Sequence, residues 1–485
     1  MSQLSFDCLM DIFDYLENDK ISLFSCLLVN KLWCNISVRI LWKDSSNYSP
    51  QTFRTLIICL LNESKEDISK NKNNLSSPIP KPPMFNYASF CKILSVHEIQ
   101  SKFKLFVRSP EQYTKSHNIL IGIFKLFMRQ ISSLKQLDIS PYDDLPIVIF
   151  TSFPGAENCL KNITELRFFS FINSEFFYHL TQFCHNIQSL TIEFCDNIIS
   201  NGLKEFLFSI QNNLKYFNII QSNKSPDLTE LVSSFTPILY NTVYEFHLNI
   251  ENVSFSFINN FTNLQELEIE LYDGSEVFEK LVSFIFPNLK ILKIDAFSVN
   301  VGLAIKFLEN NGKNLKELTF CEISGVSDNC INLAIAKFCN NLKKLCTGFR
   351  NDELEIMKIV LCSCKYLETI KIWLGDVDLL NEKVALEMIA NYSPKNLNKI
   401  ELLYCHQSYD MKRLLPVELD SFFISWAKRV TYLPITIFIK RLHITKSLDT
   451  YDENLNIIEK YIRLKVIKKF IISVEPDGGY IELLP

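Results

Sequence analysis

Apolar residues recur in a fixed hexameric pattern, L-x-x-L-x-I, along most of the chain. Well-matched copies start at residues 134, 163, 187, 214, 243, 264, 289, 315, 342, 367 and 397, and weaker copies start at 439 and 467. Successive starts over the first eleven copies lie 21 to 30 residues apart. Alternating apolar and polar positions predict a strand with one buried face. A sustained period of this length predicts supersecondary units that stack on one another.

The period and the motif are typical of leucine-rich repeats, in which each unit supplies one strand and one helix. This resemblance implies an α/β fold in which residues 132–485 form a solenoid of about 12–13 repeats, with parallel strands on the concave face and helices on the convex face. The units at 190–203 and 318–333 are similar to the cysteine-containing class of repeat. Cys195 and Cys321 are therefore expected to be buried packing residues, not redox-active thiols.

Between the N-terminus and the repeats, the composition of the chain changes twice. Residues 63–86 are rich in Ser, Asn and Lys and end with four prolines, which predicts a flexible loop; the alternative is a proline-rich ligand for an SH3-type groove. The apolar patterns of residues 88–107 and 118–131 predict two helices, and the second is apolar on nearly all sides and hence buried. Residues 45–131 are thus expected to form a helical linker region.

The first 44 residues have the pattern of three short helices. One apolar stripe contains Leu9, Ile12, Phe13 and Leu16, and breaks follow at residues 17–20 and 30–31. The stretch from residue 26 to residue 42 holds two of the four tryptophans of the chain, Trp33 and Trp42, among many aliphatic residues. Three helices in about forty residues bury too little surface to be stable alone. We therefore expect a further surface to cover them.

This N-terminal block resembles an F-box. The resemblance is carried in order by Leu4, Leu9, Ile12, Phe13, the pair Tyr15-Leu16, Asp19, the pair Leu28-Val29, Trp33 and the pair Leu41-Trp42, while Ser5 stands where the family has proline. An F-box followed by leucine-rich repeats is an established family arrangement. The resemblance implies that residues 1–44 bind a Skp-family adaptor and, through it, a cullin. The expected adaptor contacts are Leu4, Leu9, Ile12, Phe13, Leu16, Leu28 and Trp33.

Two alternatives remain open for this block. Its apolar residues could pack only with one another or against residues 88–131, and for any single residue the interior and the interface are about equally expected. Large apolar surfaces left exposed usually mark interfaces, which favours adaptor binding for the block as a whole. Trp42 is expected to close the block against the chain that follows it.

The repeat geometry also predicts which side chains face outward from each strand. In each hexamer these are the third, fifth and seventh positions. We hypothesise that a protein substrate binds this face, which is acidic in the middle, becomes basic toward the C-terminus at Lys344, Lys399 and Arg441, and carries an exposed Trp373. The alternative is an ordinary solvated strand surface. The candidate substrate-binding residues are Glu245, Glu266, Glu268, Glu270, Asp295, Glu317, Lys371 and Trp373.

Composition and motifs narrow the function classes. The net charge of −4 leaves no basic stripe typical of nucleic-acid binding, and no apolar run approaches the ~20 residues that span a bilayer. The N-terminus lacks the basic region of a signal peptide, so the 15 cysteines are expected to be reduced, in the cytoplasm and/or the nucleus. The spacing of cysteines and histidines predicts no metal site, and no catalytic motif is present.

The sequence thus predicts a non-enzymatic protein without a cofactor. The resemblance implies the substrate-recognition subunit of a Skp–cullin–F-box ubiquitin ligase. The alternative is a leucine-rich-repeat scaffold that acts in a ligase-independent complex.

Overall fold

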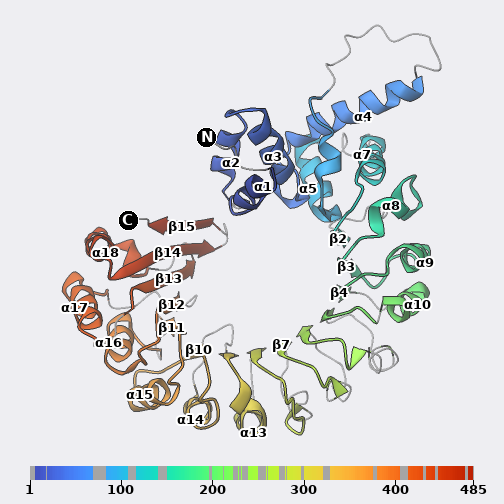
Figure 1. The fold of residues 1–485 in the computed structure, drawn as a ribbon. Coiled ribbons are helices and arrows are strands. Elements are labelled where there is room, and N and C mark those ends of the chain that lie inside the picture. Colours follow the sequence, from blue (N-terminus) through green and yellow to red (C-terminus); the bar gives the residue numbers. More distant parts are fainter. Residues whose placement is uncertain are drawn as a thin grey trace. The chain divides into compact units, whose positions relative to one another are not determined.

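The computed structural model describes most of the chain. The described residues are 6–17, 19–68, 83–107, 116–139, 150–195, 199–210, 212–221, 228, 231, 239–249, 258, 260–271, 279, 281–296, 300–320, 328–374, 379–404, 413–429, 433–442, 446–475 and 479–483. The chain divides into two compact units, Met1–Pro226 and Asp227–Pro485. Each unit is built from strands that run side by side, with helices packed on one side of them (Figure 1).

Three short helices form the N-terminal block, as the apolar pattern predicts: α1 (Phe6–Asp14), α2 (Lys20–Cys26) and α3 (Lys31–Leu41). The carboxylate of Asp19 accepts a hydrogen bond from the backbone N–H of Ser22, and the side chain of Asn30 accepts one from Trp33. Both side chains therefore satisfy backbone donors that a helix start leaves unpaired. The block has its own core, formed by Leu9, Phe13, Leu23, Cys26, Ile36 and Ile40.

The chain that leaves α3 starts the strand ladder directly. The backbone carbonyl of Lys43 accepts hydrogen bonds from the N–H groups of Lys92 (2.7 Å) and Ile93 (3.0 Å). The carbonyl of Lys92 accepts from Lys135 and Gln136 in the same way, one strand further on. As predicted, Trp42 packs against the following chain, with ring centroids 5.1 Å from Tyr48 and 4.6 Å from Tyr87.

The linker region differs from its prediction in two places. Residues 88–107 are not one helix but the 3-10 turn η2 (Tyr87–Phe90), the strand β1 (Ile93–Ser95) and the helix α5 (Val96–Val107). The helix α4 (Thr52–Ile68) continues into the segment expected to be a loop, of which residues 69–82 lie outside the described ones. The predicted helix at 118–131 is α7 (His117–Gln130), and its large apolar side chains are mostly buried.

Unit 1 continues with a ladder of parallel strands. β1 pairs with β2 (Gln136–Ile139), which is followed in order by β3 (Glu165–Phe169), β4 (Ser189–Phe194) and β5 (Tyr216–Gln221). The short turn η1 (Ser45–Asn47) precedes β1, and the elements described between β2 and β5 are η3 (Phe150–Ser152), α8 (Ala156–Leu160), α9 (Ser174–Phe183) and α10 (Asn201–Ile210). Phenylalanine rings fill much of the space between helices and strands, including Phe150, Phe168, Phe176 and Phe177.

Unit 2 has the same strand–helix plan. Its parallel strands are β6 (Glu245–Asn249), β7 (Glu266–Leu271), β8 (Ile291–Ala296), β9 (Glu317–Phe320), β10 (Lys344–Gly348), β11 (Thr369–Leu374), β12 (Lys399–Tyr404), β13 (Ile435–Leu442) and β14 (Ile467–Glu475). The helical elements are α13 (Val301–Asn311), η5 (Gly312–Asn314), α14 (Asn329–Phe338), α15 (Leu354–Ser363), α16 (Glu382–Tyr392), α17 (Pro416–Ala427), η7 (Leu448–Thr450) and α18 (Asp452–Arg463). A last strand, β15 (Gly479–Leu483), pairs antiparallel with β14 and covers its outer edge.

The strand register confirms the hexamer frame except in one unit. The fourth hexamer positions pair with one another along each ladder, for example Leu137 with Leu166 and Ile370 with Ile400. The copy assigned to residue 439 is wrong, because Ile437 occupies the position between Ile400 and Phe470. The hexamer of β13 therefore starts at Pro434, where proline replaces the usual leucine and hides the pattern.

An asparagine ladder explains why asparagine often precedes the hexamer. In five repeats, the side-chain amide of the asparagine directly before the hexamer donates a hydrogen bond of 2.7–3.0 Å to a backbone carbonyl of the preceding unit. The members are Asn213, Asn263, Asn288, Asn314 and Asn341. The ladder satisfies turn carbonyls between strands that backbone pairing leaves free.

Candidate interaction surfaces

The N-terminal block exposes large apolar side chains although its core is closed. Tyr15, Leu28 and Ile21 are 92%, 90% and 82% exposed. Ile12, Phe24 and Val29 are also exposed. These six residues come from α1, α2 and the turns that follow these helices. We call them the exposed apolar set.

The expected adaptor contacts divide between core and surface. Leu9 and Phe13 are buried in the core of the block, while Leu16 and Trp33 are partly buried against it. The ring of Trp33 meets Phe13 edge to face at a centroid distance of 5.1 Å. Ile12 and Leu28 are exposed, and Leu4 lies outside the described residues.

Four exposed apolar residues were missed by the sequence argument: Tyr15, Ile21, Phe24 and Val29. Tyr15 and Val29 belong to the motif but not to the expected adaptor contacts. Helical phase could have identified Ile21 and Phe24, because the core uses Leu23 and Cys26 of the same helix, α2. Residues on the opposite side of α2 must then face outward.

A groove of about 430 Å³ lies beside the exposed apolar set. Phe24 of α2 and Leu27, which directly follows that helix, line the groove on one side, and Trp42 and Tyr48 line it from the chain after α3. Lys20 and Glu17 add charged groups to its lining, and Glu17 forms an ion pair of 2.9 Å with Lys43. The groove is therefore apolar in part, with charged groups that can orient a partner.

In unit 2, the strand register brings the predicted acidic residues together. Glu245 pairs with Glu266, and Glu270 pairs with Asp295 on the next strand. Glu268 lies between His247 and Lys293 in the same cross-strand row. We call these seven residues of β6, β7 and β8 the acidic cluster. The third, fifth and seventh hexamer positions face away from the buried side, as the predicted alternation requires.

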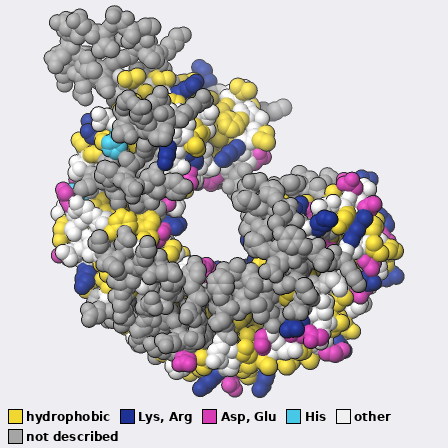
Figure 2. All heavy atoms as spheres, turned by 180° about the vertical axis from the view of Figure 1, so that it is seen from behind, with side chains coloured by type: hydrophobic (Ala, Val, Ile, Leu, Met, Phe, Trp, Pro, Cys, Tyr) yellow, Lys and Arg dark blue, Asp and Glu magenta, His cyan; other side chains and the backbone are white. Residues whose placement is uncertain are grey.

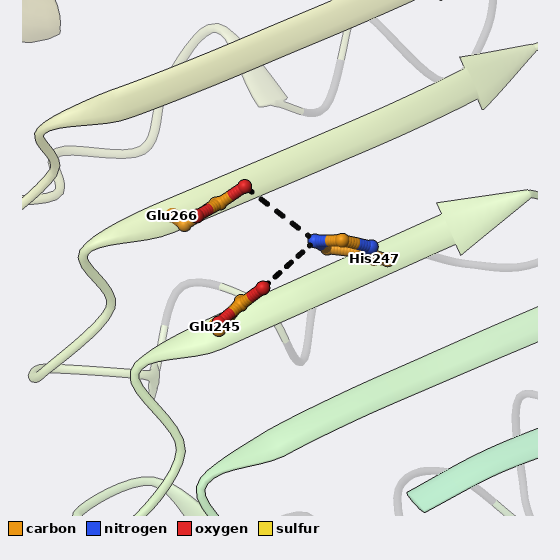
Figure 3. Close-up of side chains that lie close together, drawn as sticks. All are labelled: Glu245, His247 and Glu266. Atoms are coloured by element: carbon orange, nitrogen blue, oxygen red, sulfur yellow. Dashed lines mark ion pairs between the residues drawn. The ribbon is translucent and has the colours of Figure 1, made fainter. Parts of the chain in front are cut away.

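His247 lies at the centre of this cluster. Its Nε2 atom is 3.4 Å from Glu245, 3.7 Å from Glu266 and 3.5 Å from Glu268. Figure 3 shows the side chains of Glu245 and His247 on one strand and that of Glu266 on its neighbour, pointing toward one another. Lys293 approaches from the third strand, with its ammonium nitrogen 2.7 Å from Glu266 and 3.0 Å from Glu268.

Burial and the neighbouring charges in the acidic cluster shift the pKa values of several of its carboxyl groups. Hydrogen bonding to His247, with help from Lys293, lowers the pKa of Glu266 to about 2. Burial and the charge of Glu266 raise the pKa of Glu245. Burial, with the charges of Glu270 and Glu268, raises the pKa of Asp295 to about 6. Its Oδ1 atom is buried and has no hydrogen-bond partner among the described residues.

Glu317 stands apart from the acidic cluster. Its carboxylate forms an ion pair with Lys344, so the acidic surplus ends at β8. Glu401 on β12 is the centre of the basic region, because Lys371 (2.9 Å) and Lys399 (2.7 Å) both pair with it. Although burial raises the pKa of Glu401, these hydrogen bonds lower it below its usual value. Trp373 is half-buried, so the expectation of a fully exposed tryptophan is not met.

The sequence argument missed His247, Lys293 and Glu401. All three occupy the fifth hexamer position, and they could have been found by reading that position through every unit. Arg441 was expected on the outward face of its strand. Its Nε instead forms an ion pair of 3.2 Å with the buried carboxylate of Asp449. Cys195 is half-buried, and Cys321 lies outside the described residues.

Beyond these clusters, charges of both signs are interspersed among hydrophobic side chains on the face shown in Figure 2. Among the described residues, no helix combines the length and the apolar character that crossing a membrane requires.

The repeated parallel strand–helix units and their hexamer register fit a repeat solenoid fold of the leucine-rich-repeat type. No protein-family model matches the chain, and no curated protein matches it. Solved structures with a similar fold include the leucine-rich repeat-containing protein LegL7 from Legionella pneumophila, with 13% identity, 60% of this chain and 92% of that chain covered, and a TM-score of 0.37.

Two further similar structures are the Rad7 and Elc1 complex in yeast and an internalin from Listeria monocytogenes. The first has 12% identity, covers 64% of this chain and 86% of that chain, and has a TM-score of 0.36. The second has 10% identity, covers 66% of this chain and 88% of that chain, and has a TM-score of 0.27. All three TM-scores are below 0.5, and the repeat class therefore rests on the strands and helices of this chain.

Proposed function

We propose that the protein is the substrate-recognition subunit of a Skp–cullin–F-box ubiquitin ligase, with no catalytic chemistry of its own. The N-terminal block would bind a Skp-family adaptor, and the repeats would hold a protein substrate in the cytoplasm or the nucleus. One observation carries the proposal. A three-helix block that resembles an F-box has a closed core and still exposes six large apolar side chains. Exposed apolar surface of this kind marks an interface.

The energetics of this surface are sufficient for a specific contact. Fully burying a leucine or isoleucine side chain contributes roughly 1.5–3 kcal/mol. Ile21 and Leu28 are almost fully exposed in the free protein, so covering both contributes about 3–6 kcal/mol of gross burial energy. A partner that covers them would therefore gain at least about a hundredfold in affinity from these two side chains.

The test is direct binding of the purified full chain to a purified Skp-family adaptor. We expect Ile21→Glu with Leu28→Glu to weaken binding at least about a hundredfold without changing thermal unfolding, because both side chains are exposed. The matched control is Ile285→Glu with Leu464→Glu, two exposed apolar residues of unit 2, which should leave binding unchanged. Equal binding by both double variants would refute adaptor docking at this surface.

The alternative function is a leucine-rich-repeat scaffold in a ligase-independent complex. The repeats support it equally, since extended strand faces of repeat proteins are common binding surfaces. Full-length protein that binds no Skp-family adaptor, yet retains protein partners in affinity purification with the proteasome blocked, would favour the scaffold. Loss of those partners in Glu266→Lys with Glu268→Lys would assign partner binding to the acidic cluster in either case.

A further inference from the structure

The acidic cluster holds a set of side chains with the chemistry of a metal site. Glu245, His247 and Glu266 each offer one ligand atom, and these atoms all lie within 4.8 Å of one another. The strand geometry dictates this proximity. Glu245 and His247 are two residues apart on β6 and so share a face, and Glu266 is the cross-strand partner of Glu245.

The distances around His247 are close to those between neighbouring ligands of one metal ion. Carboxylate oxygens of Glu245, Glu266 and Glu268 lie 3.4–3.7 Å from His247 Nε2. Ligands about 2.0–2.1 Å from a tetrahedral Zn²⁺ ion are roughly 3.3–3.4 Å apart. Small side-chain rotations would therefore bring the three donor atoms to the spacing that a zinc ion requires.

The electrostatics favour an added cation at the same place. The acidic cluster contains five carboxylates (Glu245, Glu266, Glu268, Glu270 and Asp295) and one lysine, Lys293. Asp295 provides an independent sign of uncompensated charge, since its buried Oδ1 has no hydrogen-bond partner among the described residues.

We propose that Glu245, His247 and Glu266 form a binding site for a divalent transition-metal ion, with Zn²⁺ as the best match. Imidazole and carboxylate ligands together suit zinc. Three protein ligands leave one position of a tetrahedral ion for water or for a donor group of a bound partner. The site lies in unit 2 and does not depend on adaptor binding by the N-terminal block.

Lys293 is the natural competitor of the metal. Its ammonium group contacts both Glu266 and Glu268, so a metal ion must share Glu266 with it or displace it. Replacing this lysine with an uncharged residue of similar shape should therefore strengthen metal binding. An ion-pair cluster with no affinity for metal would not show this gain, and Lys293→Met consequently separates the two interpretations.

The test uses the full chain, stripped with a chelator, with its exposed thiols alkylated to remove cysteine ligation. Zn²⁺ binding is measured by competition with a fluorescent zinc indicator, and Co²⁺ absorption reports the coordination geometry. We expect micromolar or tighter binding, at least a tenfold loss for His247→Gln and for Glu245→Gln, and at least a tenfold gain for Lys293→Met. His185→Gln is the control, because this histidine is exposed on unit 1.

Absence of zinc binding in both the unmodified chain and Lys293→Met would overturn the proposal. Binding that His247→Gln and His185→Gln reduce equally, or not at all, would assign the zinc to other groups and would equally overturn it. Unchanged far-UV circular dichroism of each variant shows that the fold is retained. A failure here leaves the adaptor-binding result untouched, because that experiment reports on residues of α2 and the turn after it.

Discussion

Glu382 provides a sharp test of the buried electrostatics of unit 2. This first residue of α16 is only 3% exposed and accepts a hydrogen bond of 2.5 Å from the hydroxyl of buried Tyr404. Burial raises the pKa of Glu382 from 4.5 to about 7, although the hydrogen bonds from Tyr404 and from backbone N–H groups oppose the shift. The folded protein therefore holds a proton here that the unfolded chain releases at lower pH.

The sign of the resulting pH dependence follows from linkage. A group whose pKa is higher in the folded state stabilises the fold fully below its unfolded pKa, near 4.5, and loses that contribution as pH rises through about 7. One pKa unit corresponds to about 1.36 kcal/mol. Between about pH 5 and about pH 8, Glu382 should therefore cost the protein about 2.5 kcal/mol of its free energy of unfolding.

Glu382→Gln removes this titration. The amide loses part of the hydrogen bonding, which lowers stability by a constant amount, but the variant should gain about 2.5 kcal/mol relative to the unmodified protein between about pH 5 and about pH 8. Urea unfolding followed by circular dichroism at both pH values measures this difference. Asp295 and other groups titrate in both proteins and cancel. Glu387→Gln, on the exposed side of the same helix, is the control, and a pH-independent difference for Glu382→Gln would refute the reasoning.

Three further substitutions test the packing of the repeats, each by thermal or urea unfolding. Gly155→Ala should destabilise unit 1 by at least about 1–2 kcal/mol, because Gly155 has φ +89° and an added Cβ would lie 2.6 Å from the carbonyl oxygen of Met128. Asn311→Leu should cost about 2–4 kcal/mol, since the buried amide of Asn311 bonds the backbone of Phe286, Phe284 and Phe307; a cost no larger than that of Asn288→Ala would contradict this. Trp42→Ala should cost about 2–3 kcal/mol and raise hydrogen exchange in α1–α3, because the contacts of Trp42 with Tyr48 and Tyr87 hold the block; unchanged exchange would show that the backbone ladder suffices.

The strand ladder was predictable wherever the hexamer kept its apolar residues. Two strands escaped because one unusual residue stands at the first position: Cys91 before β1 and Pro434 before β13. Both positions allow a non-leucine for a physical reason. Cys91 is a small, fully buried residue, and proline is tolerated at the start of a strand because its missing N–H lies outside the ladder. The antiparallel β15 follows no repeat and could not be inferred from the period.

The acidic cluster was predictable in part, because residue parity on a strand is fixed by the pleat. The pleat does not show which carboxylates have a cation beside them. The cross-strand neighbours of each carboxylate come from strands about 25 residues away in the chain. Lys293 forms ion pairs with Glu266 and Glu268, whereas no ion pair to Asp295 is found among the described residues. Acidic residues at equivalent positions of the repeat therefore differ in whether a lysine lies beside them in the folded protein.

The junction at Lys43 determines how the function of the N-terminal block can be tested. Its backbone carbonyl accepts the first two hydrogen bonds of the strand ladder, from Lys92 and Ile93, and the Asp44 bridge to Ile93 continues the same pairing. Deleting residues 1–44 would remove these bonds and the contacts of Trp42 together with the exposed apolar set. Loss of adaptor binding in such a deletion would therefore follow equally from lost contacts and from an unfolded first repeat. Substitutions at Ile21 and Leu28 change only surface side chains, and for that reason they, and not the deletion, decide between a ligase receptor and a scaffold.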